Sequence, residues 1–420
     1  MNILYITPYV PSLVRVRPYQ IIRHIKERGH QVTLATLVAN RKEWNDLHRF
    51  ERYCDKILVS ELPNYRSLLN CLAALPSRLP LQSVYSWDAA LYARILEQMF
   101  HNGSSPKYDL IHVEHLRGSQ YGVRLLKQRK RAPIPPIIWD SVDSISYLFR
   151  QAAAQSKQGF GRYITRFDLP RTERREGWLT ARFDQVLVTS SKDKKALLAL
   201  SGGQGRVAVL PNGVDLDYFQ PGSFEAREPD TLVVSGKMSY HANVSMVLFL
   251  AQQVMPRVWA ARPQVNLWIV GKDPVSEIRA LAEHPNVTVT GMVDSILPYL
   301  QKATIAVAPI QYGAGIQNKV LEAMACSTPV IASPVAVSAL ETVPGENIVV
   351  ADDALTWRDA ILSLLASPQE RQKIGEAGRQ YVEKRHRWGN IAEDLEQIYA
   401  GIINTQTRNT TAKQKTEGLL

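Results

Sequence analysis

Short apolar runs recur along the chain, and stretches with helical periodicity follow most of them. In the first half the predicted strands are Asn2–Ile6, Val32–Thr36, Lys56–Ser60, Asp109–Val113, Pro136–Trp139 and Asp184–Thr189. In the second half they are Val207–Leu210, Thr231–Ser235, Val265–Val270, Val287–Thr290, Thr304–Ala308, Pro329–Ala332 and Asn347–Val350. The runs are apolar throughout rather than alternating, which is typical of parallel strands covered on both faces.

The alternation of strand and helix predicts a doubly wound α/β fold, and because it occurs twice it predicts two such domains. The boundary is expected near the glycine-rich break Ser201–Gly205, which gives domains at 1–200 and 206–380. The segment Pro368–Ile403 predicts two helices, with Trp388 between them as a packing anchor. The polar residues 406–420 are expected to form a disordered tail.

Amino-acid composition excludes several classes of protein. The chain has 420 residues, 45% hydrophobic and 21% charged, which excludes a mostly disordered, collagen-like or coiled-coil protein. No run approaches 18 uninterrupted apolar residues, so we expect no spanning helix, and the first residues lack the pattern of a signal peptide. The cysteines Cys54, Cys71 and Cys326 fit neither a disulfide framework nor a zinc site, and they indicate a reducing compartment.

Positive charge is concentrated in the first half. The net charge is +11, but residues 1–212 carry 32 Lys or Arg against 17 Asp or Glu, whereas residues 213–420 carry 18 against 22. The stretches 124–131 and 162–182 hold much of the excess. They are either solvated helix faces or a footprint for an anionic partner. Because no nucleic-acid module is recognisable, we expect a membrane surface or a phosphate-bearing lipid and no nucleic acid.

The segment Thr304–Ser333 carries the strongest candidate for a binding site. An apolar strand runs into a turn of small residues, and a helical pattern begins directly after that turn. Small residues let a ligand approach the backbone, and a helix start offers free amides and the positive end of the dipole, which bind anions. The residues expected to line this site are Gly313, Gly315, Ile316, Gln317, Asn318, Lys319 and Glu322.

Two side chains make this interpretation more specific. The Lys319 ammonium can reach a phosphate at the helix start, and Glu322, on the same helix face, can accept two hydroxyls of a ribose. Together they describe a nucleoside diphosphate held at the carboxyl end of a parallel sheet. The alternative is a plain strand–helix turn with an exposed Lys and an exposed Glu.

Other strand ends offer supporting groups. Gly236 and Lys237 follow the strand Thr231–Ser235, and Lys237 could neutralise a diphosphate from the opposite side. Gly271 opens a third loop that could touch the base or the ribose. Asp215-Leu216-Asp217 has the D-x-D form that some transferases use to hold a metal, but it lies inside a turn, where local hydrogen bonding is its expected role. We predict no metal.

Several motifs resemble those of one enzyme family. Pro211–Asp215 resembles the PNGVD linker of retaining GT-B glycosyltransferases of family 4, and Lys319–Ala332 resembles their LEAMACGTPVI signature. Arg28–Val32 is similar to their RGHEV opening. The GIxNKVLEAMA and GxMxYxxN forms resemble the sugar transferases of exopolysaccharide clusters most closely.

The resemblance implies two Rossmann-like domains that face each other across a cleft, with residues 381–405 crossing back to the first domain. The second domain would hold a UDP- or GDP-linked sugar, and the first would hold a glycan or polyprenyl-linked acceptor, with Arg17 and Arg15 on the acceptor side. The implied activity is retaining hexosyl transfer in cell-surface or exopolysaccharide synthesis. It needs no metal or other cofactor and takes place in the cytoplasm, peripherally at the inner face of the plasma membrane.

The chain departs from the family pattern at four places. Ala314 stands where many members have a sugar-holding carboxylate, and Asn243 stands near the second of two diphosphate cations. Lys319 would compensate for that missing cation. The loop Pro8–Arg15 lacks glycine. Where many members place a histidine after a first-domain strand, Asp143 is the nearest match and Asp140 the other candidate.

In the implied reaction the main task is to stabilise negative charge on the leaving diphosphate, which Lys237 and Lys319 would do as catalytic cations. Asp143 would orient a sugar hydroxyl or stabilise positive charge, and a helix N-cap is its alternative role. A nucleotide-sugar epimerase of the same fold and a non-catalytic binding protein are rival interpretations. The absent carboxylate at Ala314 favours the second rival.

Overall fold

A computed structural model describes residues 1–100, 107–155, 160–313 and 315–417, with the backbone alone at 152–155, 160–165 and 407–417. The chain forms two compact units. The first comprises Met1–Pro211 and Trp388–Leu420, and the second comprises Asn212–Arg387. The first unit is therefore built from both ends of the chain, as the expected return of the C-terminal helix requires.

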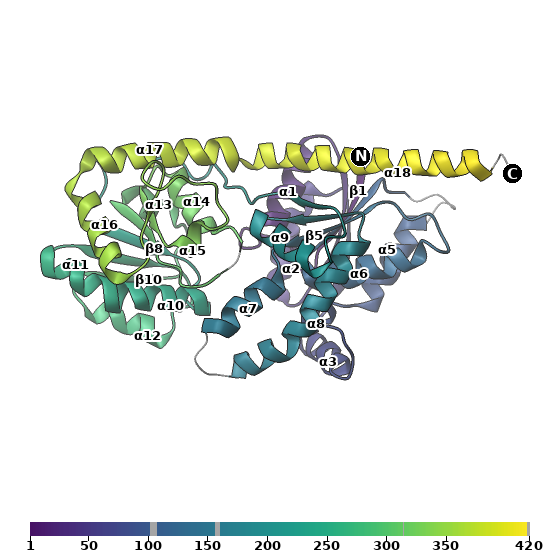
Figure 1. Ribbon diagram of the computed structural model, residues 1–420, viewed down its shortest axis with the longest axis horizontal. Helices are drawn as coiled ribbons and strands as arrows, with labels where there is room; N and C mark the ends of the chain where they lie inside the picture. Colours follow the sequence, from purple (N-terminus) through teal and green to yellow (C-terminus); the bar gives the residue numbers. More distant parts are fainter. Residues whose placement is uncertain (101–106, 156–159, 314, 418–420) are drawn as a thin grey trace. The chain divides into compact units, whose positions relative to one another are not determined.

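Within the described residues, the first unit holds a seven-stranded parallel sheet in the order β3-β2-β1-β4-β5-β6-β7 (Figure 1). Its strands are β1 (Asn2–Ile6), β2 (Gln31–Val38), β3 (Lys56–Glu61), β4 (Leu110–Glu114), β5 (Ile137–Val142), β6 (Gln185–Val188) and β7 (Val207–Val209). Every pairing between them is parallel. Parallel pairing requires crossover helices between the strands, and these explain the alternation seen in the sequence.

Helices cover both faces of this sheet because successive residues of a strand point to opposite sides. Ile3 and Tyr5 of β1 belong to a core with α1, α2 and α18, whereas Leu4 and Ile6 belong to a core with α5, α6, α8 and α9. The helices of the unit are α1 (Val16–Glu27), α2 (Arg41–Phe50), the 3-10 turn η1 (Glu51–Tyr53), α3 (Asn64–Ala74), α4 (Leu81–Tyr85), α5 (Ala89–Phe100), α6 (His115–Gln128), α7 (Ile145–Gln155), α8 (Phe160–Arg182), α9 (Ser191–Leu200) and α18 (Trp388–Glu417).

The second unit repeats the plan, with a parallel sheet in the order β10-β9-β8-β11-β12-β13. Its strands are β8 (Thr231–Ser235), β9 (Asn266–Val270), β10 (Val287–Gly291), β11 (Ile305–Ala308), β12 (Val330–Ala332) and β13 (Val349–Val350). Its helices are α10 (His241–Phe249), the π-helical turn η2 (Leu250–Val254), α11 (Met255–Ala261), α12 (Ser276–Ala280), the 3-10 turn η3 (Leu281–Glu283), α13 (Leu297–Lys302), α14 (Asn318–Ala325), α15 (Pro334–Val337), α16 (Ala354–Ala366) and α17 (Pro368–Arg385).

One helical run of the described residues, His241–Ala261, is long and apolar enough to cross a membrane by length and composition. Its side chains Met246, Leu250, Val254 and Val258 are buried in the core of the second unit. One face of the run therefore packs into the core of the second unit.

The structure confirms the two doubly wound sheets and corrects three boundaries. The return to the first unit begins at Trp388, whereas residue 381 was expected. Val207–Leu210, assigned to the second domain from the sequence, forms β7 and pairs with β6 of the first sheet. The units therefore divide after Pro211, at the turn that follows β7. At the chain end, α18 continues to Glu417, so most of the segment 406–420 expected to be disordered is helical.

Candidate active site

Both sheets have a point where the strand order reverses. In the second unit this point lies at β8, which has β9 on one side and β11 on the other. Ligands of open α/β sheets bind outside the carboxyl ends of the strands at such a point, because the loops from the two neighbouring strands diverge there. The loops that follow β8 and β11 hold most of the predicted donor-site residues.

The loops after β8 and β9 approach each other so closely that only glycine fits. Gly236 has φ 154° and Gly271 has φ 149°. A Cβ atom on Gly271 would lie 1.7 Å from the Gly236 carbonyl oxygen. The Gly236 amide donates to the Val270 carbonyl oxygen at 3.0 Å, which fixes the spacing of the two loops. The predicted residues Gly236 and Gly271 thus form one continuous backbone surface at this edge.

Lys319, from the first turn of α14, reaches the loop after β8. Its Nζ donates to the Asn243 Oδ1 at 2.6 Å, and the Asn243 Nδ2 donates to the Lys237 carbonyl oxygen at 2.9 Å. A Cβ atom on Gly236 would lie 3.3 Å from the Lys319 Nζ. The structure thus brings together the lysine and the neutral Asn243 that it was expected to compensate for. Burial lowers the pKa of Lys319 to about 8, although nearby Glu322 opposes the shift.

Glu322 lies one turn further along α14 and is half-buried. Burial raises the pKa of its carboxyl group to about 7, with Lys319 acting in the opposite direction. Within the described part of the chain, no hydrogen bond or ion pair occupies this carboxylate. The nearby Asn318 Oδ1 is buried and also has no hydrogen-bond partner among those residues. The Glu322 carboxylate and the Asn318 Oδ1 are therefore both available to accept hydrogen bonds in the first turns of α14.

The turn before α14 has the predicted form. Gly315 has φ 68°, Ile316 is buried, and the N-cap residue Gln317 makes no side-chain hydrogen bond to the first turn of the helix. Gly313 lies against the Gln317 side chain, since a Cβ atom there would be 3.4 Å from its Nε2. Ala314, which stands where a sugar-holding carboxylate was expected, lies outside the described residues.

Lys237 and Asp215, two further residues of the second unit considered from the sequence, have different surroundings from Lys319 and Glu322. Lys237 is exposed, and its Nζ lies 3.9 Å from the Asp273 Oδ2. The Asp215 carboxylate accepts hydrogen bonds from the Asp217 and Tyr218 amides, as expected for a turn. Among the described residues, no group of three or more His, Cys, Asp or Glu side chains could hold a metal ion.

In the first unit, Arg17 and Asp140 form a buried ion pair. The Arg17 Nε donates to Asp140 at 2.9 Å, and another guanidinium nitrogen donates to the Leu210 carbonyl oxygen at 3.0 Å. Burial alone would raise the pKa of Asp140, but Arg17 and His112 outweigh it and lower the pKa to about 2. The two predicted side chains, Arg17 and Asp140, therefore bind each other. Their hydrogen bonds connect α1 to β5 and to the residue that follows β7.

Asp143 and Arg15 lie nearer the carboxyl edge of the first sheet. Asp143 accepts a hydrogen bond from the Thr189 hydroxyl at 2.8 Å, and burial, reinforced by Asp193, raises its pKa to about 6. The preceding residue, Val142, has φ 67°, which is strained for a β-branched side chain. Arg15 pairs with Glu43 at 2.8 Å.

The strand order of the first sheet reverses at β1, between β2 and β4, and residues that were not predicted from the sequence gather there. His115 directly follows β4 and has φ 62°. Beside it, the Tyr9 hydroxyl donates to Glu114 at 3.0 Å, and burial raises the pKa of Glu114 to about 8. Burial lowers the pKa of His115 to about 4, so its ring is neutral at pH 7. The sequence-based candidates for this position, Asp140 and Asp143, lie at the end of β5, whereas His115 lies two residues beyond the predicted strand Asp109–Val113.

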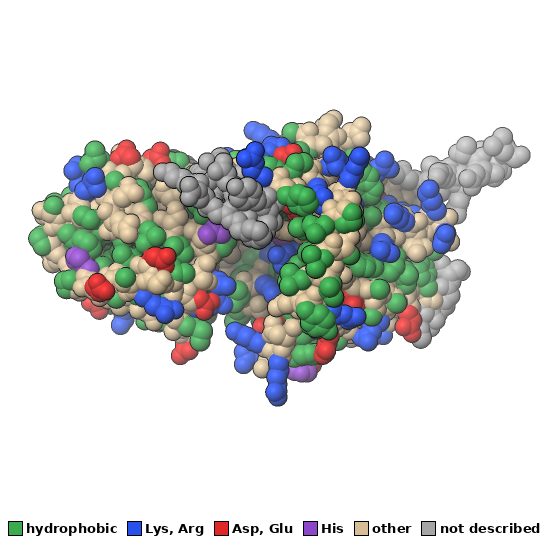
Figure 2. All heavy atoms as spheres, turned by 90° about the horizontal axis from the view of Figure 1, so that it is seen from below, with side chains coloured by type: hydrophobic (Ala, Val, Ile, Leu, Met, Phe, Trp, Pro, Cys, Tyr) green, Lys and Arg blue, Asp and Glu red, His purple; other side chains and the backbone are tan. Residues whose placement is uncertain are grey.

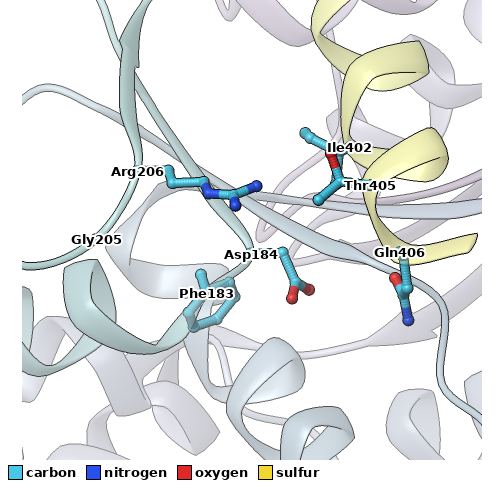
Figure 3. A pocket seen from close by; sticks show the side chains of 7 residues that line it. All are labelled: Phe183, Asp184, Gly205, Arg206, Ile402, Thr405 and Gln406. Atoms are coloured by element: carbon cyan, nitrogen blue, oxygen red, sulfur yellow. The ribbon is translucent and has the colours of Figure 1, made fainter. Parts of the chain in front are cut away.

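A pocket elsewhere in the first unit lies at the wrong end of the sheet for such a site. It is lined by Asp184 and Arg206, which directly precede β6 and β7, and by Ile402 and Gln406 of α18 (Figure 3). It therefore opens at the amino ends of the strands, and Asp184 is already paired with Arg129. We do not include it in the candidate active site.

Comparisons with known proteins identify a family for each half of the chain. A family model described as Glycosyltransferase Family 4 matches residues 14–218, and one described as Glycosyl transferases group 1 matches residues 229–367. A GDP-mannose-dependent monoacylated alpha-(1-6)-phosphatidylinositol monomannoside mannosyltransferase of Corynebacterium glutamicum is 29% identical over 212 residues, which are 45% of this chain and 55% of that protein. The chain spans 54–61% of the length of three curated relatives that it matches.

Solved structures share the fold. Sucrose-phosphate synthase of Thermosynechococcus elongatus has a TM-score of 0.67 at 18% identity, covering 96% of this chain and 100% of that one. HepE of Anabaena, in complex with UDP-glucose, has a TM-score of 0.63 at 16% identity with the same coverage. With the two family models covering most of the chain, these findings show that it belongs to the family 4 glycosyltransferases of the GT-B fold.

Proposed function

We propose that this protein transfers a hexosyl group, with retention, from a UDP- or GDP-linked sugar to a glycan or lipid-linked acceptor in cell-surface or exopolysaccharide synthesis. The observation that carries the proposal is the meeting of Lys319, Glu322 and the Gly236–Gly271 surface where the strand order reverses in the second unit. A mannosyltransferase relative is named GDP-mannose-dependent, and HepE was solved with UDP-glucose. Both names support a nucleotide-sugar donor.

The chemistry follows from the charges at this edge. Breaking the anomeric C–O bond leaves negative charge on the diphosphate, and fixed positive groups stabilise that charge. The Lys319 ammonium, the exposed Lys237 and the amides of α14 supply them here. Loss of one such contact typically raises a barrier by about 3–4 kcal/mol. Glu322 would accept the ribose hydroxyls, because its carboxylate has no competing partner among the described residues.

If the configuration at the anomeric carbon is retained, the protein has little chemistry to do on the acceptor side. The acceptor hydroxyl would attack from the face that the diphosphate leaves, and a phosphate oxygen would take its proton. No strong protein base is then needed. Asp143 would orient a sugar hydroxyl or stabilise positive charge, and its raised pKa of about 6 leaves most of it ionised at pH 7. We propose no metal for this reaction.

The excess of positive charge in residues 1–212 extends the proposal to the acceptor. A basic surface attracts both an anionic leaflet and a polyprenyl diphosphate. We therefore propose that the protein works in the cytoplasm, peripherally at the inner face of the plasma membrane, on an acceptor carried by a lipid.

A thermal-shift screen of nucleotide sugars tests the donor. A ligand at 100 times its Kd stabilises the protein by about 2.7 kcal/mol. We expect one UDP- or GDP-sugar to do so with the natural chain and with the control Glu346→Gln, an exposed glutamate of the same unit, but not with Glu322→Gln. Failure of every nucleotide sugar, or equal stabilisation of Glu322→Gln, would contradict the proposal.

A second measurement separates transfer from the rival activities. If the protein is a transferase, free UDP or GDP accumulates only after an acceptor is added. Interconversion of the donor sugar without an acceptor would instead indicate an epimerase. Binding with no turnover under any condition would indicate a binding protein, which the alanine at position 314 favours.

A further inference from the structure

The α3 helix of the first unit shows an inverted burial pattern. Tyr65, Leu68, Leu69 and Leu72 are each 58–64% exposed, whereas the small residues Ser67 and Ala74 are buried. Positions three and four residues apart share one helix face, so the large apolar side chains form an outward stripe, which Leu75 extends. A helix that only covers a core would bury these side chains and expose the small polar ones.

The neighbouring elements hold this stripe in place. The Asn70 side chain donates to the Trp87 carbonyl oxygen at 2.8 Å, and Arg171 of α8 donates to the Leu75 carbonyl oxygen at 2.8 Å. The Leu81 amide, at the start of α4, donates to the buried Asp168 of α8 at 2.9 Å. These bonds attach both ends of the region to the body of the unit. Its apolar face is thus a fixed surface feature.

The charged residues of the segment that carries the stripe are all positive. Residues 62–87 contain no Asp or Glu, and Arg66 and Arg78 are exposed. Along adjacent α8, the half-exposed rings Phe167 and Trp178 carry arginines above them, with the Arg171 guanidinium 4.0 Å from the Phe167 ring centre. In the view from below, green and blue side chains gather over the part of the first unit from which α3 projects (Figures 1 and 2).

We propose that α3 docks the protein on an anionic membrane surface. Its tyrosine and leucines would enter the boundary between headgroups and acyl chains, and the surrounding arginines would bind lipid phosphates. A second copy of the chain fits this surface less well. A symmetric contact would bring Arg66 and Arg78 of one copy close to the same arginines of the other copy, and their positive charges would repel. The inference deepens the proposed function, since it names the surface that would bring the first unit to a lipid-linked acceptor.

Flotation with vesicles tests the surface. The full chain is mixed with vesicles of phosphatidylglycerol and phosphatidylcholine, or of phosphatidylcholine alone, and the partition coefficient is measured. We expect binding to the anionic vesicles only. Leu68→Ser with Leu72→Ser should lower the coefficient by about tenfold for each leucine removed. Arg66→Gln and Arg78→Gln should each lower it by about fivefold.

The matched control is Leu355→Ser, which removes a 53% exposed leucine from the second unit and should leave binding unchanged. Since all these side chains are exposed, each variant should keep the melting temperature of the natural chain. Equal partitioning of the Leu68/Leu72 variant and the natural chain would overturn the inference. So would a dimer that this variant converts to a monomer while vesicle binding is absent.

The donor measurement separates this inference from the proposed function. The Leu68/Leu72 variant should keep the nucleotide-sugar stabilisation of the natural chain, and Glu322→Gln should keep vesicle binding while losing that stabilisation. If vesicles bind without any donor response, the proposed function fails and the docking surface stands. If a donor stabilises the protein but vesicles do not bind, the docking surface is wrong and the proposed function stands.

Discussion

At the scale of single residues, the contact between Lys319 and Asn243 allows the positive charge to be moved from position 319 to position 243. The two side chains meet at 2.6 Å, although they come from different elements. Lys319→Met removes the ammonium and should lower the affinity for the nucleotide-sugar donor by on the order of 10–100-fold, because a hydrogen bond to a charged group contributes roughly 1.5–3 kcal/mol. Adding Asn243→Lys to that variant returns a cation to the same place and should restore most of the affinity.

The measurement is donor affinity by calorimetry on four proteins, which are the natural chain, each single variant and the double variant. Asn243→Lys alone should not improve binding, because two ammonium groups would then share one site. Equal affinities of the natural chain and Lys319→Met would show that Lys319 does not hold the diphosphate. A double variant as weak as Lys319→Met would show that position 243 cannot take over the role.

The same pair of residues predicts a pH dependence. Burial holds the pKa of Lys319 at about 8 and that of Glu322 at about 7. Above pH 8 the free protein has lost the Lys319 proton, so donor binding must take a proton up and its Kd should rise with pH. Below pH 7 the protonated Glu322 is a poorer acceptor, so the Kd should also rise as the pH falls. Calorimetry across this range should show tightest binding between the two values.

Two variants show which residue causes each limb of the plot of donor Kd against pH. Lys319→Arg keeps its charge at every accessible pH and should lose the alkaline limb. Glu322→Gln, measured at the higher donor concentrations that its weaker binding requires, should lose the acid limb. A profile that is flat between pH 6 and pH 9 (roughly one unit outside each value) would contradict both roles.

From the sequence, the placement of side chains could be predicted where neighbours in sequence act together, but not where the partners are distant. Lys319 and Glu322 share one helix, so their spacing alone placed them on one face. Arg17 and Asp140 are 123 positions apart, and nothing in either segment shows that they form a buried pair. Each was therefore expected to be available to a substrate. His115 could have been named as a candidate by the rule that ligands bind at the carboxyl ends of parallel strands, applied at β4 as well as at β5.

At the scale of elements, the strand-end loops of the second unit depend on glycine. An alanine at position 271 would place its Cβ atom 1.7 Å from the Gly236 carbonyl oxygen, in addition to the strain of φ 149°. Backbone atoms cannot move aside as a flexible side chain does, so the two loops must separate. We expect Gly271→Ala to destabilise the protein by about 3 kcal/mol or more and to abolish donor binding.

Gly291→Ala is the matched control, because Gly291 has φ 66° but nothing lies within 4 Å of its absent Cβ atom. It should cost only the backbone penalty of about 1–2 kcal/mol and should leave donor affinity unchanged. Denaturant unfolding measures both variants. Equal losses of stability would show that the loop contact is not the cause.

The elements themselves were largely predictable, since strands that are buried on both faces read as uninterrupted apolar runs. The exception was β7, a three-residue strand whose sequence does not show which sheet it joins. Its partner β6 lies before the glycine-rich break, so the break marks a loop inside the first unit. Local composition identifies flexible turns, but strand pairing decides which of them separates domains.

At the scale of the whole molecule, the last helix completes the unit that the first residues begin. Trp388, Ile391, Leu395 and Tyr399 of α18 are buried with Ile21 and Ile25 of α1 and with Tyr5 of β1. The Tyr399 hydroxyl also bonds to the buried His112 ring at 2.7 Å. The order of elements along the chain therefore differs from their grouping in space, which the sequence indicated only through the family resemblance.

This arrangement predicts opposite effects for two truncations. A chain ending at Arg387 exposes one face of the first core, and burying each large apolar side chain of α18 contributes about 1.5–3 kcal/mol. The four residues together exceed the lower range of total stability, about 5–15 kcal/mol, so the first unit should unfold or aggregate. A chain ending at Gln406 keeps all four and should retain the melting temperature and donor affinity of the natural protein. Calorimetric scans of both would settle the point: a first unit that melts normally without α18 would mean that this helix covers the sheet without being needed to stabilise it.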